Sequence, residues 1–193
     1  MVSSRAAYLA FLLLIALERL FEVALSRRNA ARVLARGARE YGGSHFAWMA
    51  ALHIAFLASC AVESAFHRFP GTAGWIALVV ALAAQALRYW AVSSLGDRWN
   101  ARVMVVPGEP PVQTGPYRFI RHPNYLAVVL EMVAIPLVHG CWVTAFVFSL
   151  ANAAMLRVRI RVEEAALGEP WQRAFAERPR FMPPASRGGL GGG

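Results

Sequence analysis

Two groups of residues in the second half of the chain could together bind a small zwitterion. The first is the run Arg-His-Pro-Asn-Tyr at positions 121–125, and the second is the acidic pair Glu163-Glu164. Cationic side chains beside a helix N-terminus can hold a carboxylate, because the helix dipole adds its positive end to their charge. Carboxylates at the end of an apolar helix resist removal from water unless a cation pairs with them. We therefore expect an anion at the basic motif and an ammonium group at the acidic pair.

The segments between these groups predict how they are positioned. Residues 123–138 and 141–160 are mostly apolar and meet at His139-Gly140, a pattern that predicts a helical hairpin. Each helix would be about 24–30 Å long, which is close to the thickness of a bilayer core. Pro123 suits the first helical turn, with His122 near the cap. Because a hairpin returns to the side that it left, both motifs should face each other at one membrane surface.

The acidic pair also has an interpretation that needs no ligand. Arg157, Arg159 and Arg161 precede it, and Arg159 lies four residues before Glu163. Side chains at this spacing are neighbours on a helix and can form an ion pair. An interfacial salt-bridge network therefore explains the same residues, and spacing alone does not separate the two interpretations.

A longer pattern resembles a known family. The run Gly-Pro-Tyr-Arg-Phe-Ile at positions 115–120 leads into the basic motif, with the acidic pair beyond it. Together they resemble the isoprenylcysteine carboxyl methyltransferase family over roughly residues 88–183. The resemblance implies an integral-membrane O-methyltransferase that uses S-adenosylmethionine. It also implies that Arg121 serves the cofactor carboxylate or the substrate, as a catalytic residue. The cofactor-binding residues that it implies are Tyr117, His122, Tyr125, Glu163 and Glu164.

Other residues indicate where an acceptor would bind. Residues 95–110 and Asn152 resemble the bacterial branch of the family that is associated with type III polyketide synthases and methylates alkylresorcinols or alkylpyrones. That resemblance implies Trp99, Asn100 and Asn152 as substrate-binding residues. Asn152 could point into the ligand cavity, although an intramembrane Asn often only bridges helices. The residues predicted to share its helical face are Leu156, Ile160 and Glu163.

Glu131 lies in the middle of an apolar segment, where a lone carboxylate is costly unless it is neutral, paired or functional. Arg88, in the preceding apolar segment, is its expected partner. An acceptor carboxylate is already ionised at neutral pH, whereas a phenol with a pKa near 10 would benefit from a general base. Glu131 and His122 are the candidate catalytic bases.

Composition indicates a membrane protein. The chain has 193 residues, 58% of them hydrophobic, and a positive mean hydropathy, which suits one compact membrane bundle. The net charge of +9 could indicate nucleic-acid binding. However, apolar blocks near bilayer length divide the arginine clusters, so a bias toward the cytoplasmic leaflet is the simpler cause and no nucleic-acid partner is expected. Cys60 and Cys141 lie in apolar segments without metal-ligand spacing and are expected to be buried thiols, and no metal is implied.

The predicted fold is an all-α integral-membrane bundle of about five transmembrane helices with a C-terminal helical hairpin. The apolar segments before the hairpin are residues 6–25, 46–62 and 73–94. A cleaved signal peptide is the competing interpretation of the first segment. We expect one domain over residues 1–182 and a disordered Gly/Pro-rich tail over residues 183–193.

Arginine positions predict the orientation. Sixteen of the twenty arginines fall in three polar segments that alternate with the proposed spans, namely residues 26–45, 95–124 and 157–193. By the positive-inside rule, the N-terminus should lie outside and the C-terminus and active site in the cytoplasm of a bacterial inner membrane.

The predicted function is methyl transfer from S-adenosylmethionine to a lipophilic acceptor that enters from the lipid bilayer. The acceptor would be an alkylresorcinol or alkylpyrone hydroxyl, or the carboxylate of a prenylated cysteine. A membrane sterol reductase that uses NADPH carries a similar arginine-histidine-tyrosine stretch but is much longer, and a non-enzymatic membrane binding protein is the third possibility. The short chain and the acidic pair Glu163-Glu164 favour the methyltransferase.

Overall fold

The structure is a computed structural model, and it describes residues 3–43 and 45–181. The predicted tail over residues 183–193 lies outside this part of the chain. Two short antiparallel strands pair Arg39 with Val105, and two 3-10 helices lie in the connections. The helices are α1 (Ser4–Ala35), α2 (His45–Glu63), α3 (Thr72–Leu95), α4 (Pro123–Leu137) and α5 (Trp142–Ala174). The remaining elements are β1 (Arg39–Tyr41), η1 (Gly96–Arg98), β2 (Val103–Val105) and η2 (Gly115–Arg118).

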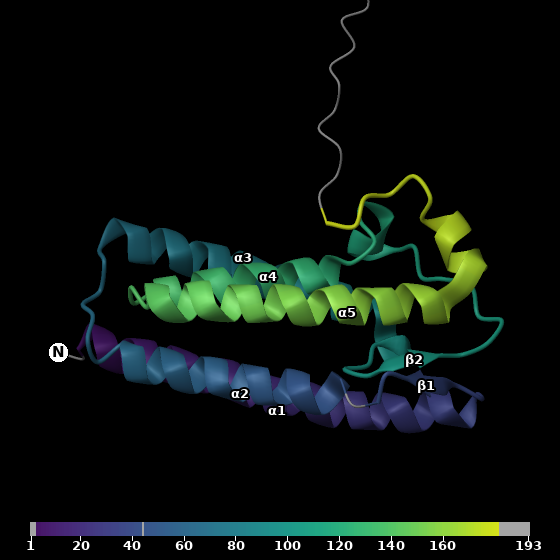
Figure 1. Ribbon diagram of the computed structural model, residues 1–193, viewed down its shortest axis with the longest axis horizontal. Helices are drawn as coiled ribbons and strands as arrows, with labels where there is room; N and C mark the ends of the chain where they lie inside the picture. The colour runs from purple at the N-terminus through teal and green to yellow at the C-terminus, as the bar shows by residue number, and fades with distance from the viewer. Residues whose placement is uncertain (1–2, 44, 182–193) are drawn as a thin grey trace, which may run out of the picture.

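The five helices run along one long axis of the molecule (Figure 1). The strands and the C-terminal part of α5 gather at one end of this axis, and the start of α1 and the turn between α4 and α5 lie at the other. The α4–α5 hairpin therefore forms as the sequence predicts. It brings the residues just before α4 back to the end of the molecule that holds the C-terminal half of α5.

The helices have the length and composition of a membrane bundle. Three of them are long and apolar enough to cross a bilayer, whereas α4 is apolar but shorter and α1 carries several charges. Large apolar side chains on their outer faces are exposed, as expected for contact with lipid. These include Trp48, Trp75, Val79, Phe146 and Leu150. The protein is thus an all-α integral-membrane bundle.

Helix α1 is longer than the apolar segment over residues 6–25 predicts. It continues to Ala35 because its polar second half packs on the loop that follows α3. Asn29 is 2% exposed, and its Nδ2 donates to the carbonyl oxygens of Gly96 at 3.2 Å and Trp99 at 2.8 Å. These bonds pair the polar side of the second half of α1 with a buried loop. Part of the polar segment predicted over residues 26–45 is therefore helical.

Helix α5 also continues beyond the position that the sequence predicts. The apolar pattern ends near residue 160, but the helix includes the acidic pair and is interrupted only at Gly168, which has φ 67°. Residues 165–167 read Ala-Ala-Leu, which favours a helix, and glycine adopts a positive φ at little cost. Glu163 and Glu164 therefore project from a regular helix, one turn before a bend.

Gly115 places the motif that precedes α4. It has φ 57°, and a Cβ at this position would lie 2.0 Å from Ser94 Oγ at the end of α3. Only glycine allows η2 to approach α3 this closely, and this approach positions the chain that continues through Tyr117 into the basic motif.

Glu63 fixes the start of α5 and yields a stability prediction. Its Oε1 accepts from the backbone N–H of Val143 at 3.0 Å, and its Oε2 accepts from Thr144 N at 2.7 Å. Loss of such a cap costs about 1 kcal/mol, so Glu63→Ala should lower the melting temperature in detergent by roughly 2–4 °C. The matched control is Glu169→Ala, because the pair of Glu169 with Arg173 is solvent-exposed. An equal shift in both variants would contradict the capping role.

Candidate cofactor and acceptor site

The hairpin brings the basic motif and the acidic pair into direct contact, as the sequence predicts. His122 Nε2 lies 3.1 Å from Glu164 Oε1, and the hydroxyl of Tyr125 donates to Glu163 Oε2. His122 is the N-cap of α4, and Pro123 is its first residue. The predicted helix start is therefore confirmed, and one turn of α4 faces one turn of α5.

A tyrosine hydroxyl replaces the predicted ion pair between Arg159 and Glu163. Arg159 Nε donates to Tyr125 Oη at 2.8 Å, and its Nη2 donates to the carbonyl of Ala101 at 2.6 Å. Within residues 3–43 and 45–181, Arg159 and Glu163 form no salt bridge, and Glu163 Oε1 accepts no hydrogen bond. One oxygen of the Glu163 carboxylate is thus available to a ligand.

Glu164 is instead committed to the C-terminal segment. Arg180 donates to both of its carboxylate oxygens, at 3.0 Å and 2.6 Å, and the negative charge raises the pKa of Arg180 above its usual range. His122 Nε2 contacts the same carboxylate at 3.1 Å. The two members of the acidic pair therefore differ, since Glu163 has an oxygen without a hydrogen-bond partner and both oxygens of Glu164 are bound by Arg180.

Arg121 binds the same C-terminal segment from the other side. Its guanidinium donates to the carbonyl oxygens of Ala176 and Arg178, and it lies 6.0 Å from the centre of the Trp171 ring. Its backbone N–H donates to the carbonyl of Pro179 at 2.9 Å. The catalytic role that the resemblance implies for Arg121 stays a prediction, and in this structure the residue anchors the chain after α5.

Aromatic rings form one wall of the site. The His122 ring stacks on Tyr125 at 5.3 Å between centroids and lies 5.5 Å from the ring of Trp171. Tyr117 is also buried, and burial together with the negative charge of Glu163 raises its pKa above the usual range. Tyr117 is therefore neutral and can donate a hydrogen bond.

Two neighbouring cavities with mixed polar and apolar walls form a cleft at this end of the bundle. We call it the polar cleft because the third cavity of the molecule is far more apolar. The volumes of the two neighbouring cavities are about 90 Å³ and 150 Å³. His122 and Tyr125 line the smaller cavity, and Arg121 and Trp171 line the larger one. The cleft therefore holds most residues of the cofactor site that the sequence predicts. The residues that line both cavities are Leu95, Arg98, Met104, Val105, Tyr117, Glu163 and Leu167.

A larger, mostly apolar cavity of about 310 Å³ lies between α1, α2, α4 and α5. Asn152, which is 3% exposed, lines it, as its predicted helical face requires. The apolar lining residues include Leu20, Val23, Met49, Ile54, Leu57, Val128, Met155 and Leu156. This cavity suits the apolar part of a lipophilic molecule.

The polar cleft and the apolar cavity share a wall. The five residues that line both the smaller polar cavity and the apolar cavity are Trp99, Asn100, Asn124, Tyr125 and Arg159. Trp99 and Asn100 are thus placed at the boundary between the predicted cofactor and acceptor sites. Sequence analysis did not identify Asn124 and Arg159 as members of this wall, although Asn124 lies inside the basic motif.

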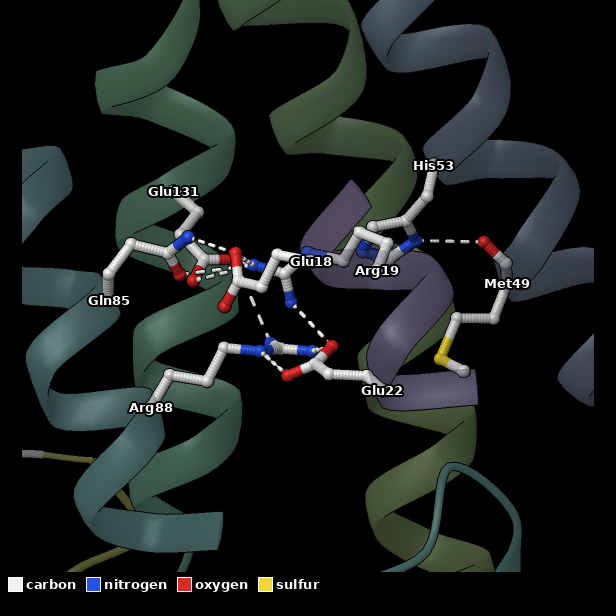
Figure 2. A network of polar contacts seen from close by, with 8 residues as sticks. All are labelled: Glu18, Arg19, Glu22, Met49, His53, Gln85, Arg88 and Glu131. Carbon is white, nitrogen blue, oxygen red and sulfur yellow. Dashed lines mark hydrogen bonds and ion pairs between the residues drawn. The ribbon is translucent and has the colours of Figure 1, made fainter. Parts of the chain in front are cut away.

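Glu131 lies in a polar network inside the membrane bundle (Figure 2). Arg88 binds Glu22 through two bonds of 2.5 Å and 2.6 Å and lies 3.7 Å from Glu131, its predicted partner. Arg19 contacts Glu131 at 3.3 Å and Glu22 at 2.8 Å. With Glu18 included, three carboxylates share two guanidinium groups. Glu131 lines none of the three cavities, so this placement favours the paired role over that of a base.

Comparison with known proteins identifies the family. Residues 75–169 match the model of the isoprenylcysteine carboxyl methyltransferase family. A Bacillus subtilis protein, described as the uncharacterized protein YpbQ, is 42% identical over 163 residues, which cover 82% of this chain and 97% of the relative. The chain belongs to the isoprenylcysteine carboxyl methyltransferase family. A Haemophilus influenzae protein, described as uncharacterized, is 24% identical over 151 residues, which cover 77% of this chain and 88% of that protein.

Family membership indicates a membrane methyltransferase. The names of the relatives identify no acceptor, so the predicted likeness to the polyketide-associated branch stays a prediction. The buried free thiols of Cys60 and Cys141 agree with their predicted environment.

The charge imbalance in the network yields a second stability prediction. Glu22→Gln should lower the melting temperature by roughly 3–10 °C, because Arg88 loses its two-bond partner. Glu131→Gln should shift it by less than half as much, since the contacts of Glu131 with Arg19 at 3.3 Å and Arg88 at 3.7 Å are longer than those of Glu22. Thermal unfolding of both variants in the same detergent measures the difference. A larger loss in Glu131→Gln would show that Glu131 is the main partner of the network.

Proposed function

We propose that the protein is an S-adenosylmethionine-dependent O-methyltransferase that acts on a lipophilic acceptor. The wall shared by the polar cleft and the apolar cavity carries this proposal. Transfer of a methyl group needs a charged, water-soluble donor and a greasy acceptor to meet in line at a short distance. A polar space and an apolar space that meet at one wall provide this arrangement.

The residues of the cleft fit the amino-acid part of the donor. Glu163 Oε1 is free to accept from its ammonium group, and Arg121 lines the larger polar cavity, where its charge favours the carboxylate. The buried, neutral Tyr117 adds an aromatic face and a hydroxyl donor. When bound, S-adenosylmethionine supplies an electrophilic methyl group on its sulfonium.

The residues of the shared wall would align the acceptor. Arg159 is 5% exposed and is held by Tyr125 and by the carbonyl of Ala101. A fixed guanidinium at the wall can hold an acceptor oxygen in line with the methyl group. The packed rings of His122, Tyr125 and Trp171 keep bulk water from the same place.

The apolar cavity supports an acceptor that comes from the bilayer. It lies among α1, α2, α4 and α5, and its walls are mostly apolar. An alkylresorcinol or alkylpyrone hydroxyl and a prenylated cysteine carboxylate share the necessary chemistry, which is one reactive oxygen on an apolar body. The partners that we propose are the lipid bilayer and the lipophilic acceptor, and we propose no nucleic-acid partner.

The proposed cofactor site should be tested through Glu163. Glu163→Gln preserves size and removes the charge, so the dissociation constant for S-adenosylmethionine should rise about 10- to 100-fold. Glu164→Gln should have a smaller effect, because Arg180 and His122 already surround that carboxylate. Isothermal titration in detergent measures both, with the exposed Glu169→Gln as the control and NADPH as the competing ligand.

Two outcomes of that titration would contradict the proposal. Wild-type affinity in both the Glu163 and Glu164 variants would support a salt-bridge network that binds no ligand. Binding of NADPH in place of S-adenosylmethionine would support a reductase.

The proposed orientation places the polar cleft in the cytoplasm of a bacterial inner membrane. In a background with Cys60→Ala and Cys141→Ala, single cysteines replace three exposed residues: Arg28 in the second half of α1, Pro170 in the C-terminal part of α5, and Arg68 between α2 and α3. An impermeant thiol reagent applied to intact cells should label only the variant at position 68. Labelling at position 28 or 170 from outside would reverse the topology.

A further inference from the structure

Two polar side chains inside the apolar cavity have hydrogen-bonding atoms without a partner among the described residues. Asn152 on α5 is 3% exposed, and its side-chain amide forms no hydrogen bond within residues 3–43 and 45–181. His53 on α2 lines the same cavity, and only its Nδ1 is bonded, to the carbonyl oxygen of Met49 at 2.8 Å (Figure 2). Neither the Asn152 amide nor His53 Nε2 is sealed off by surrounding atoms. Buried polar groups in proteins are usually satisfied, so these two indicate a polar group of a bound molecule.

The charged side chains of the cavity away from the shared wall are bound to one another. Arg88 binds Glu22 through bonds of 2.5 Å and 2.6 Å, and Arg19 binds the same carboxylate at 2.8 Å. Away from the shared wall, His53 and Asn152 are therefore the polar side chains of the described chain that a ligand in this cavity can engage.

His53 and Asn152 lie on facing sides of two antiparallel helices, at nearly the same level. The rings of Phe56 on α2 and Phe148 on α5 are in contact, with 5.7 Å between their centroids. His53 precedes Phe56 by three residues and Asn152 follows Phe148 by four, so each shares a helix face with its phenylalanine. At about 1.5 Å per residue, these steps move about 4.5 Å and 6 Å in the same direction from the phenylalanine contact. One ligand group between α2 and α5 can therefore reach both side chains.

The atoms of the two side chains determine which ligand group they bind. The carbonyl of Met49 only accepts, so Nδ1 of His53 carries the proton and Nε2 of the neutral ring offers a lone pair. The amide of Asn152 both donates and accepts. A hydroxyl can donate to His53 and accept from Asn152 at once, whereas an ether or ketone oxygen leaves His53 without a donor. A charged group is disfavoured by the cost of its burial among apolar walls.

An apolar stretch separates this position from the proposed site of methyl transfer. Asn152 precedes Arg159 of the shared wall by seven residues, which corresponds to about 10 Å along α5. Between them, Met155 and Leu156 line the cavity. The cavity is therefore polar at the shared wall, apolar over about two helical turns, and polar again at His53 and Asn152.

We propose that His53 and Asn152 bind a second polar group of the acceptor, a hydroxyl that lies about 10 Å from the oxygen that receives the methyl group. This inference rests on the proposed methyltransferase function. The hydroxyl donates to His53 Nε2 and accepts from the Asn152 amide. It is not methylated itself, because it lies too far from the polar cleft for in-line displacement. The acceptor is then a lipophilic molecule with a hydroxylated chain, whichever of its other oxygens is methylated.

The test uses the full chain in detergent with S-adenosylhomocysteine present, so that titration measures binding without turnover. The probes are a 5-alkylresorcinol and an S-alkylated cysteine. Each is made with a plain chain, with a chain hydroxyl about 10 Å from the reactive oxygen, and with a hydroxyl at the chain end. For at least one headgroup, the hydroxyl at about 10 Å should lower the dissociation constant of the wild type about tenfold, and the terminal hydroxyl should not.

Variants assign this preference to the two side chains. His53→Phe and Asn152→Leu should each remove the tenfold preference, while the plain compounds bind within about threefold of wild type. His53→Gln keeps an acceptor oxygen and should restore part of the preference. The double variant of His53→Phe and Asn152→Leu should lose no more than either single variant, because both side chains bind the same hydroxyl. Melting temperatures near wild type check that all variants are folded.

The possible failures are separable. Equal affinity of the wild type for plain and hydroxylated chains would show that only water binds His53 and Asn152, and would overturn this inference alone. Additive losses in the double variant would overturn the shared position. Methyl transfer from labelled S-adenosylmethionine is measured independently. A hydroxyl preference without any transfer would contradict the proposed function and, with it, the acceptor as the occupant of the site.

Discussion

The rest of the site depends on the contact between the start of α4 and the stretch of α5 that carries Glu163 and Glu164. His122 meets Glu164 and Tyr125 meets Glu163, so the two ends of the hairpin are tied by charged and polar groups at one surface. The bend at Gly168 then turns the chain back over the motif, where Arg180 completes the surroundings of Glu164. As a result, Glu163 keeps one free oxygen in the polar cleft.

The first half of the chain supplies the second wall. Asn29 and Ser26 of α1 hold the loop after α3, which places Trp99 beside Asn124 in the boundary between the two cavities. The network of Glu22, Arg88 and Glu131 ties α1 to α3 and α4 within the bundle (Figure 2). Removal of one partner from a buried ion pair strongly destabilises the folded protein. The network therefore holds α1, α3 and α4 in fixed positions, and α1 and α4 form part of the wall of the apolar cavity.

The sequence predicts the elements whose signals are local and strong. Apolar length predicts the helices, Pro123 predicts the start of α4, and the hairpin predicts that Glu163 and Glu164 face His122 and Tyr125. The sequence cannot show the extra turns of α1, because they depend on hydrogen bonds from Asn29 to a loop about 70 residues away. The sequence also cannot show that Tyr125 lies between Arg159 and Glu163, because this contact depends on how α4 packs against α5. Glu163 and Glu164 differ in their hydrogen-bond partners because Arg180, which lies after the bend in the chain, binds only Glu164.

The central claim is that methyl transfer takes place at the wall shared by the polar cleft and the apolar cavity. An experimental structure with bound S-adenosylhomocysteine, the product of the proposed reaction, tests it most directly. We expect the ammonium group to lie against Glu163 and the sulfur to face the wall formed by Trp99, Asn124 and Tyr125. A product bound elsewhere, or with its sulfur directed away from the apolar cavity, would contradict the account.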